Sequence, residues 1–199
     1  MLRLVKLTSF AVTALLLIAG LAGMAQAEKV VLADFEQLGV AADGSLPDWV
    51  LKEAGTKLVL TSDPQLVSQG NRALQVFMTV TKDQNRAMLQ LLTHGANWSD
   101  LTGLYVDVYN PLEESVDLIV AIQTANWDWK EFASITLDPG WNRDVYISFN
   151  QPFWKSSATG WAYTSVLTDK EEVNGLNFMF VVYNAGDCMF AIDNIRVER

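Results

Sequence analysis

The chain has 199 residues, of which 23 are acidic and 14 are basic, so its net charge at pH 7 is −9. Such an acidic surface repels phosphate backbones and anionic lipid headgroups, so nucleic acid is excluded as an expected partner. Cys188 is the only cysteine, which excludes an internal disulfide as a source of stability.

The first 27 residues predict an export signal. A short basic start, MLRLVK, precedes a long apolar run, and Ala25-Gln26-Ala27 is typical of a cleavage site. A membrane anchor is the alternative, but the polar and glycine residues that interrupt the run favour cleavage. We therefore expect a secreted or periplasmic protein with no membrane insertion after cleavage. Its mature part, residues 28–199, would be one domain with a net charge near −11, because Arg3 and Lys6 leave with the signal.

From Lys29 onward the sequence predicts strands. Short apolar runs with period two alternate with turn residues, from KVVLADFE at residues 29–36 to CMFAIDNIRV at residues 188–197. The pattern predicts an all-β fold, an antiparallel β-sandwich of two sheets arranged as a jelly roll. Residues 150–174 are too long for a hairpin loop, and we expect this segment to pack across one sheet.

Acidic residues lie near both ends of the predicted domain. Asp34 and Glu36 belong to the first strand and Asp193 to the last. A carboxylate inside an apolar strand is costly unless a cation or hydrogen-bond donors meet it. First and last strands of a sandwich often pair, and calcium takes roughly 6 to 8 oxygen ligands, so the two ends together predict a calcium site. The alternative is that Glu36 and Asp193 are bound by backbone amides or by Arg196.

Aromatic and amide side chains predict a ligand-binding face. Trp127 and Trp129, in ANWDWKEF, would share one side of a strand. Aromatic rings stack on the apolar face of a pyranose, and carboxylate and amide groups bind its hydroxyl rim. The candidate face consists of Tyr105, Asp107, Tyr109, Gln123, Trp127, Trp129, Asn177 and Tyr183.

Four further aromatic residues have expected places. Trp154 and Trp161, in the long segment, would close over the candidate face, whereas Trp49 and Trp141 are assigned to the core. The alternative is that the aromatic residues of the candidate face simply pack beneath residues 150–174, because large aromatic side chains are mostly buried.

Catalytic motifs are weak. His94 is the only histidine, and the residues around it offer no nucleophile at a recognisable spacing. Adjacent acids such as Glu113 and Glu114 face opposite sides of a strand, although Asp128 and Glu131 come closer to an acid pair. We therefore expect no catalytic residue, and a small lyase or glycosidase is the weakest alternative.

Five stretches resemble a known family when they are taken in order: DFE at 34–36, SQGNRALQV at 68–76, LYVDVYNP at 104–111, LDPGWNRDVYISF at 137–149 and FAIDNIRV at 190–197. Together they resemble the calcium-stapled β-jelly-roll carbohydrate-binding modules of the galactose-binding-like superfamily, which occur in many secreted polysaccharide-degrading enzymes. The resemblance implies a structural calcium ion bound by Glu36 and Asp193, with main-chain oxygens near Gly70 and Asn71 as further ligands.

The sequence thus leads to one hypothesis of function and one alternative from another class. The hypothesis is an exported, non-catalytic protein that binds a polysaccharide or oligosaccharide, with an enzyme as a possible partner. The alternative is a structural or protein-interaction β-sandwich at the cell surface or in the periplasm.

Overall fold

A computed structural model describes residues 28–41 and 45–199. The predicted export signal, residues 1–27, lies outside the described residues. Within the described ranges no helix is long and apolar enough to cross a membrane.

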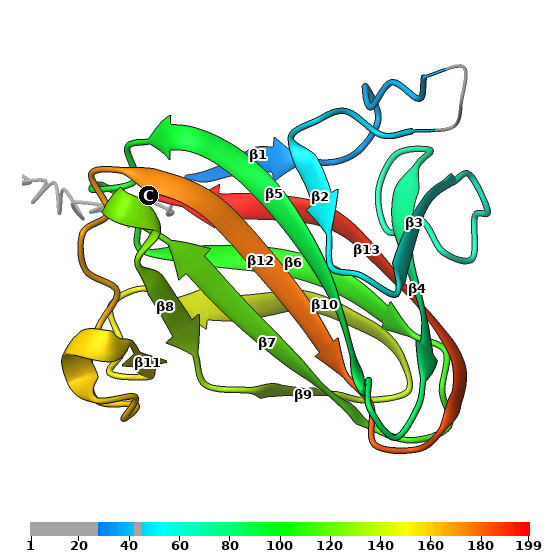
Figure 1. Cartoon of the computed structure of the whole chain (residues 1–199). Helices are drawn as coiled ribbons and strands as arrows, with labels where there is room; N and C mark the ends of the chain where they lie inside the picture. The colour runs from blue at the N-terminus through cyan, green and yellow to red at the C-terminus, as the bar shows by residue number, and fades with distance from the viewer. Residues whose placement is uncertain (1–27, 42–44) are drawn as a thin grey trace, which may run out of the picture.

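Two antiparallel sheets face each other and form a sandwich (Figure 1). The first, here called sheet A, has the strand order β10-β6-β13-β4-β3, and β1 also pairs with β13. Its strands are β1 (Lys29–Ala33), β3 (Thr56–Thr61), β4 (Ala73–Val80), β6 (Gly103–Asn110), β10 (Gly140–Ser148) and β13 (Gly186–Glu198).

The second, sheet B, has the order β11-β8-β7-β12-β5-β2, and β9 pairs with β7. Its strands are β2 (Val50–Lys52), β5 (Arg86–Ala96), β7 (Val116–Gln123), β8 (Trp129–Phe132), β9 (Ile135–Leu137), β11 (Trp154–Lys155) and β12 (Val173–Val181). Two short 3₁₀ turns, η1 (Ala125–Trp127) and η2 (Ser157–Thr159), complete the described elements. The predicted all-β sandwich is confirmed.

The core lies between the sheets because each central strand turns its apolar alternate residues inward. Leu104, Val106 and Val108 do so from β6, and Phe178 and Phe180 do so from β12. The two sheets meet through aromatic contacts such as the stacked rings of Phe180 and Phe190, whose centroids are 4.6 Å apart. Burial of each such side chain stabilises the fold by roughly 1.5–3 kcal/mol.

Trp154, near the start of the long segment, belongs to this core. The sequence led us to expect that it closes over the candidate face, and that expectation was wrong. Its side chain is 1% exposed and packs edge-on against Phe132 and Phe149. Its indole N–H donates to the carbonyl of Ser148 at 2.8 Å, which satisfies the one polar atom that the burial removes from water.

The chain's first and last strands are neighbours, as the sequence predicted. Strand β1 pairs with β13 in antiparallel register, with Lys29 opposite Glu198. The pairing of β13 with β6 changes register between Asp193 and Arg196, where Asn194 adopts a left-handed conformation with φ of 51°. Asparagine tolerates this conformation better than most residues, so the Asp193-Asn194 pair marks a β-bulge in the last strand.

The β3–β4 connection, residues 62–72, folds over the outer face of sheet A. It is held there by Trp141, whose indole N–H donates to the Gln65 carbonyl at 3.1 Å, and by Arg143, which donates to the Ser68 carbonyl at 3.2 Å. Trp141 therefore lies half-buried on the outer face, against the ring of Tyr109, and its assignment to the core was wrong.

Candidate functional site

The eight residues of the predicted face do not share a face. Tyr105, Asp107 and Tyr109 lie on β6 in sheet A, whereas Gln123, Trp129 and Asn177 lie on β7, β8 and β12 in sheet B. The prediction of one shared face was wrong because alternation orders side chains within a strand but does not say which sheet the strand joins.

The two remaining residues of the predicted face lie at opposite ends of sheet B. Trp127 is in η1, the turn between β7 and β8, so it does not share a strand with Trp129. Tyr183 follows β12 and donates to Asp117 at 2.9 Å, at the end of β7 remote from Gln123.

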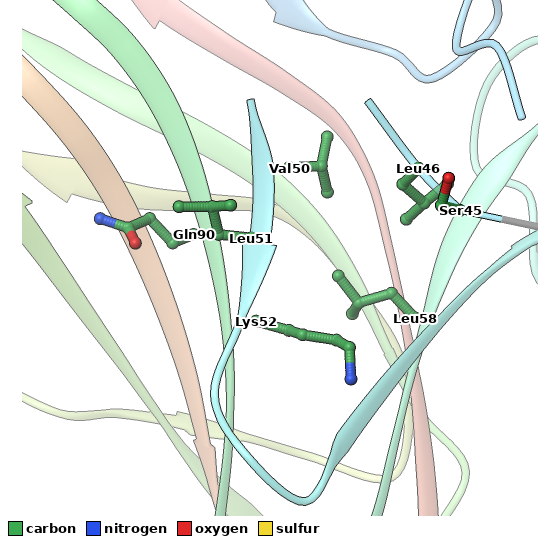
Figure 2. Close-up of a pocket in the computed structure, with 7 residues that line it drawn as sticks. All are labelled: Ser45, Leu46, Val50, Leu51, Lys52, Leu58 and Gln90. Carbon is green, nitrogen blue, oxygen red and sulfur yellow. The ribbon is translucent and has the colours of Figure 1, made fainter. Parts of the chain in front are cut away.

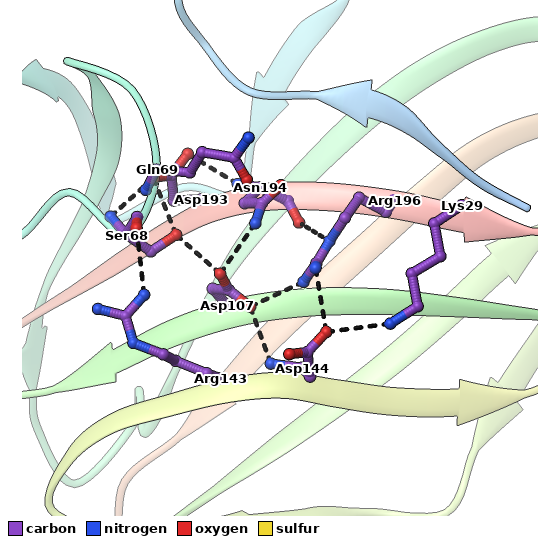
Figure 3. Close-up of polar contacts among 9 residues, drawn as sticks. All are labelled: Lys29, Ser68, Gln69, Asp107, Arg143, Asp144, Asp193, Asn194 and Arg196. Atoms are coloured by element: carbon purple, nitrogen blue, oxygen red, sulfur yellow. Dashed lines mark hydrogen bonds and ion pairs between the residues drawn. The ribbon is translucent and has the colours of Figure 1, made fainter.

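The sheet A residues are occupied by contacts within the protein. The Tyr105 ring packs 4.6 Å from the Tyr146 ring and lies under the ammonium group of Lys29. Asp107 is almost fully buried and accepts hydrogen bonds from the Ser68 hydroxyl and from Arg196, each at 2.8 Å (Figure 3). Asp107 thus binds the 62–72 loop through Ser68, whereas Tyr105 packs among its neighbours on the same sheet.

Asp193 holds one half of that loop. Its side chain is wholly buried, and its Oδ2 accepts hydrogen bonds from the Ser68 amide at 2.9 Å and the Gln69 amide at 3.0 Å (Figure 3). Burial raises the pKa of Asp193, because the charged form loses water, while the amide donors act in the opposite direction.

Glu36 holds the other half of the loop. Its Oε1 accepts hydrogen bonds from the amides of Asn71 at 2.6 Å and Arg72 at 2.8 Å, and these amides lower its pKa. Carboxylates from the first and last parts of the domain thus bind one loop through its backbone. This is the alternative in which backbone amides, and not a cation, bind Glu36 and Asp193. The structure describes no group of three or more His, Cys, Asp or Glu side chains that could hold a metal within residues 28–41 and 45–199, so calcium stays a prediction.

Sheet B has an outer face on which polar and aromatic side chains are aligned across the strands. One row crosses six strands in register and consists of Lys155, Glu131, Ala121, Asn177, Gln90 and Leu51. The neighbouring row consists of Trp129, Gln123, Gly175 and Leu92. Because Ala121 and Gly175 are small, the longer side chains on either side reach over the middle of the sheet.

An aromatic cluster with a charged centre lies at the edge of this face formed by β11 and β8. Glu131 accepts hydrogen bonds from the Trp129 indole at 3.3 Å and the Tyr163 hydroxyl at 3.1 Å, and it forms an ion pair with Lys155 at 2.6 Å. The ammonium of Lys155 also lies 4.6 Å from the centre of the Tyr163 ring. Although burial opposes the charge, the hydrogen bond to Glu131 raises the pKa of Lys155, so its ammonium group stays charged at neutral pH.

Two tryptophans near this edge are exposed and have left-handed backbones. Trp127 is 54% exposed with φ of 61°, and Trp161 is 53% exposed with φ of 65°. A left-handed conformation costs a bulky residue roughly 1–3 kcal/mol, and such strain is concentrated at functional sites. These exposed rings gain nothing from core burial, which is consistent with a role at the surface.

Sequence reasoning missed four residues of the sheet B face: Gln90, Lys155 and Tyr163 entirely, and Glu131 as a binding residue. Gln90 was detectable, because in AMLQLL it alternates with the core residues Leu89 and Leu91. Lys155 and Tyr163 come from the irregular segment, where periodicity carries no signal.

A hollow of about 490 Å³ lies at the opposite edge of sheet B, beside β2 (Figure 2). It is lined by Ser45, Leu46, Val50, Leu51, Lys52, Leu58 and Gln90. Figure 2 shows that the Gln90 amide extends away from the leucines that line the hollow and toward β12. The polar end of Gln90 therefore belongs to the outer face of sheet B.

No family model and no curated protein matches the chain. Similar solved structures include a family 11 carbohydrate-binding module from Clostridium thermocellum in complex with a β-1,3-1,4-mixed-linked tetrasaccharide. Its TM-score is 0.55 at 18% identity, over 85% of this chain and 94% of that one.

Two further structures are similar to a comparable degree. A family 28 carbohydrate-binding module specific for non-crystalline cellulose has a TM-score of 0.60 at 14% identity, over 86% of this chain and 95% of that one. An exo-β-agarase has a TM-score of 0.62 at 17% identity, over 84% of this chain but 24% of the agarase. At these identities the likeness shows the fold, a β-sandwich like that of carbohydrate-binding modules.

Proposed function

We propose that this protein binds carbohydrate without catalysis, through the outer face of sheet B. The observation that carries the proposal is the cluster of Trp129, Tyr163 and Glu131 beside a row of neutral amides. The similar structures support it, because two of them are carbohydrate-binding modules and one is in complex with a tetrasaccharide.

The chemistry of the face matches that of a sugar. The half-buried ring of Trp129 offers a surface for the C–H face of a pyranose, and ring contacts of this kind contribute roughly 0.5–1.5 kcal/mol each beyond simple burial. Gln123 lies next to Trp129 in the pairing of β7 with β8, so hydrogen-bonding groups border the ring. Carboxylate and amide groups are suited to the hydroxyl rim of the same sugar.

We infer a binding role and not glycoside hydrolysis from the state of the two acids in this region. Both oxygens of Glu131 already accept hydrogen bonds, and Asp128 forms an ion pair with Lys130 at 2.9 Å. A glycosidase needs one carboxyl group held protonated beside one that is ionised. The agarase resemblance covers only a minor part of that enzyme and carries no catalytic argument.

The proposal also includes export of the protein and a structural calcium ion. The signal-like residues 1–27 support secretion or a periplasmic location. Glu36 and Asp193, with Asn71, would hold the calcium ion. The loop amides use Oε1 of Glu36 and Oδ2 of Asp193. Among the described residues the second oxygen of each carboxylate has a single further donor, so it retains acceptor capacity. When bound, the ion would supply positive charge to both ends of the domain.

The test is a titration of the protein with soluble mixed-linked β-glucan and with agarose oligosaccharides, followed by tryptophan fluorescence and calorimetry. We expect the Trp127→Ala, Trp129→Ala double variant to lose at least about ten-fold in affinity, because it removes the stacking surface. Trp141→Ala, a matched change on sheet A, should bind like the wild type. Absence of any response across a broad glycan panel would overturn the proposal.

A further inference from the structure

We propose that Gln90, Gln123 and Asn177, grouped around Gly175, form a subsite that reads the hydroxyl groups of an uncharged sugar. This inference rests on the proposed function and deepens it by assigning a specificity site and a ligand class. The three amides come from three adjacent strands, β5, β7 and β12, and so lie on a rigid part of sheet B.

The first observation is a bridge of two amides across β12. Gln90 Nε2 donates a hydrogen bond to Gln123 Oε1, although the two residues belong to strands on opposite sides of β12. The bridge passes over Gly175, because a Cβ at that position would lie 2.8 Å from Gln123 Oε1 and 2.9 Å from Gln90 Nε2. The glycine therefore provides the space that the two amides occupy.

The second observation is the hydrogen-bonding capacity that the bridge leaves over. Gln90 Oε1, an acceptor, and Gln123 Nε2, a donor, make no hydrogen bond with any of the described residues, and both side chains are partly exposed. A sugar hydroxyl both donates and accepts, so it can bind the two groups together. Amides that served only to pack the outer face would not need to present one unused acceptor beside one unused donor.

The third observation is an unmet acceptor in the same place. Asn177 is wholly buried although it lies on the outer face, and it donates to the Ala121 carbonyl at 3.3 Å and to Gln123 Oε1 at 3.4 Å. Its Oδ1 has no partner among the described residues. A buried acceptor without a partner destabilises the folded protein, so a ligand that supplied a donor here would recover part of that loss.

The charges around the subsite define the ligand class. The three reading groups are neutral amides. Three cations of sheet B are in ion pairs, Lys155 with Glu131, Lys130 with Asp128 and Asp169, and Arg86 with Glu53, and Lys52 donates to the Thr56 carbonyl. A uronate or sulfate group would meet the field of an acidic protein, and the three amides supply no positive charge to offset it. The subsite therefore favours an uncharged hexose polymer.

The experiment measures calorimetric affinities of the wild type for mixed-linked β-glucan, agarose oligosaccharides, alginate and a sulfated galactan. The Gln90→Leu, Gln123→Leu double variant should lose at least about ten-fold in affinity for the neutral glycan that the wild type prefers. Gln75→Leu makes the same change on a half-buried glutamine of β4 in sheet A and should leave affinity unchanged. Gly175→Ala should also weaken binding, because its methyl group takes the space of the bridge.

The outcomes separate the two proposals. If the wild type binds no glycan, the proposed function fails. If it binds a neutral glycan and the Gln90→Leu, Gln123→Leu variant binds equally well while melting cooperatively, the amide subsite is wrong. Tighter binding of alginate or the sulfated galactan than of every neutral glycan would overturn the ligand class. Should Gly175→Ala fail to fold, the double variant alone decides.

Discussion

Asp193 shows how a single carboxylate can be accommodated inside an apolar strand. Its Oδ2 accepts hydrogen bonds from two backbone amides and from the Ser68 hydroxyl, and the bulge at Asn194 supplies a further amide to Oδ1. Each of these bonds offsets part of the desolvation that raises its pKa. The residue is thus an anchor for residues 68 and 69 of the loop.

Asp193→Asn should therefore destabilise the protein by roughly 1–3 kcal/mol, because the new NH₂ group would face N–H donors and leave at least one of them unpaired. Urea unfolding at neutral pH measures the change. The matched control is Asp187→Asn, which alters an exposed residue bonded to the Thr79 hydroxyl and should stay within about 0.5 kcal/mol of the wild type. An equal effect in both variants would contradict the anchoring role.

The lowered pKa of Glu36 makes the stability of the folded protein depend on pH. The amides of Asn71 and Arg72 lower its pKa in the folded protein below the ordinary 4.5. Between the two pKa values the unfolded chain binds more protons, so the contribution of Glu36 is present above 4.5 and is lost as the pH falls through the lowered pKa. The shift of Asp193 has the opposite sign, because its folded pKa is raised.

Glu36→Gln should accordingly be less stable than the wild type near neutral pH, and the two proteins should converge in acid. Urea midpoints at about pH 7 and about pH 3 test this expectation, because the difference comes from a proton that only the wild type takes up. Glu113→Gln, on an exposed glutamate, should follow the wild type at both values. A difference that does not change with pH would count against the link to Glu36 ionisation.

Among the structural elements, the segment 150–174 combines two roles. Trp154 enters the core through β11, while Trp161 and Tyr163 remain exposed after η2. The segment is fixed to sheet B by the pairing of β11 with β8 and by the ion pair of Lys130 with Asp169, at 2.8 Å. A backbone bridge between Trp154 and Ser165 holds the segment together internally. The length of the segment therefore allows one part to be anchored to sheet B while another part exposes aromatic side chains.

Two tryptophan variants of this one segment should separate these roles. Trp154→Ala should cost roughly 3–5 kcal/mol of stability, because it leaves a cavity between Phe132 and Phe149. Trp161→Ala, the matched change at an exposed site, should alter stability by no more than about 0.5 kcal/mol. Chemical denaturation measures the free energy of unfolding of both variants. Equal losses of stability would show that Trp154 and Trp161 do not have separate core and surface roles.

At the scale of the whole molecule, the sequence was sufficient to predict the class of fold. It was not sufficient to predict which residues form the outer face of sheet B. Period-two alternation identified the strands and their inner residues, such as Val106 and Phe178, because burial selects apolar side chains locally. It could not place Tyr105 and Gln123 on opposite sides of the sandwich, since strand pairing depends on contacts remote in sequence. Lys155 and Tyr163 reach the face through an irregular segment, for which no periodic signal exists.

The two ends of the described domain are joined through the loop of residues 62–72. Glu36 and Asp193 bind the same loop from opposite ends of the domain, so an ion shared between them would restrain nearly the whole unfolded chain. We expect millimolar calcium to raise the melting temperature relative to excess chelator, since a ligand that binds only the folded state stabilises it. The rise should vanish in a Glu36→Gln, Asp193→Asn variant and persist in Asp187→Asn. Identical melting of the wild type in calcium and in chelator would mean that the loop amides alone join the two ends.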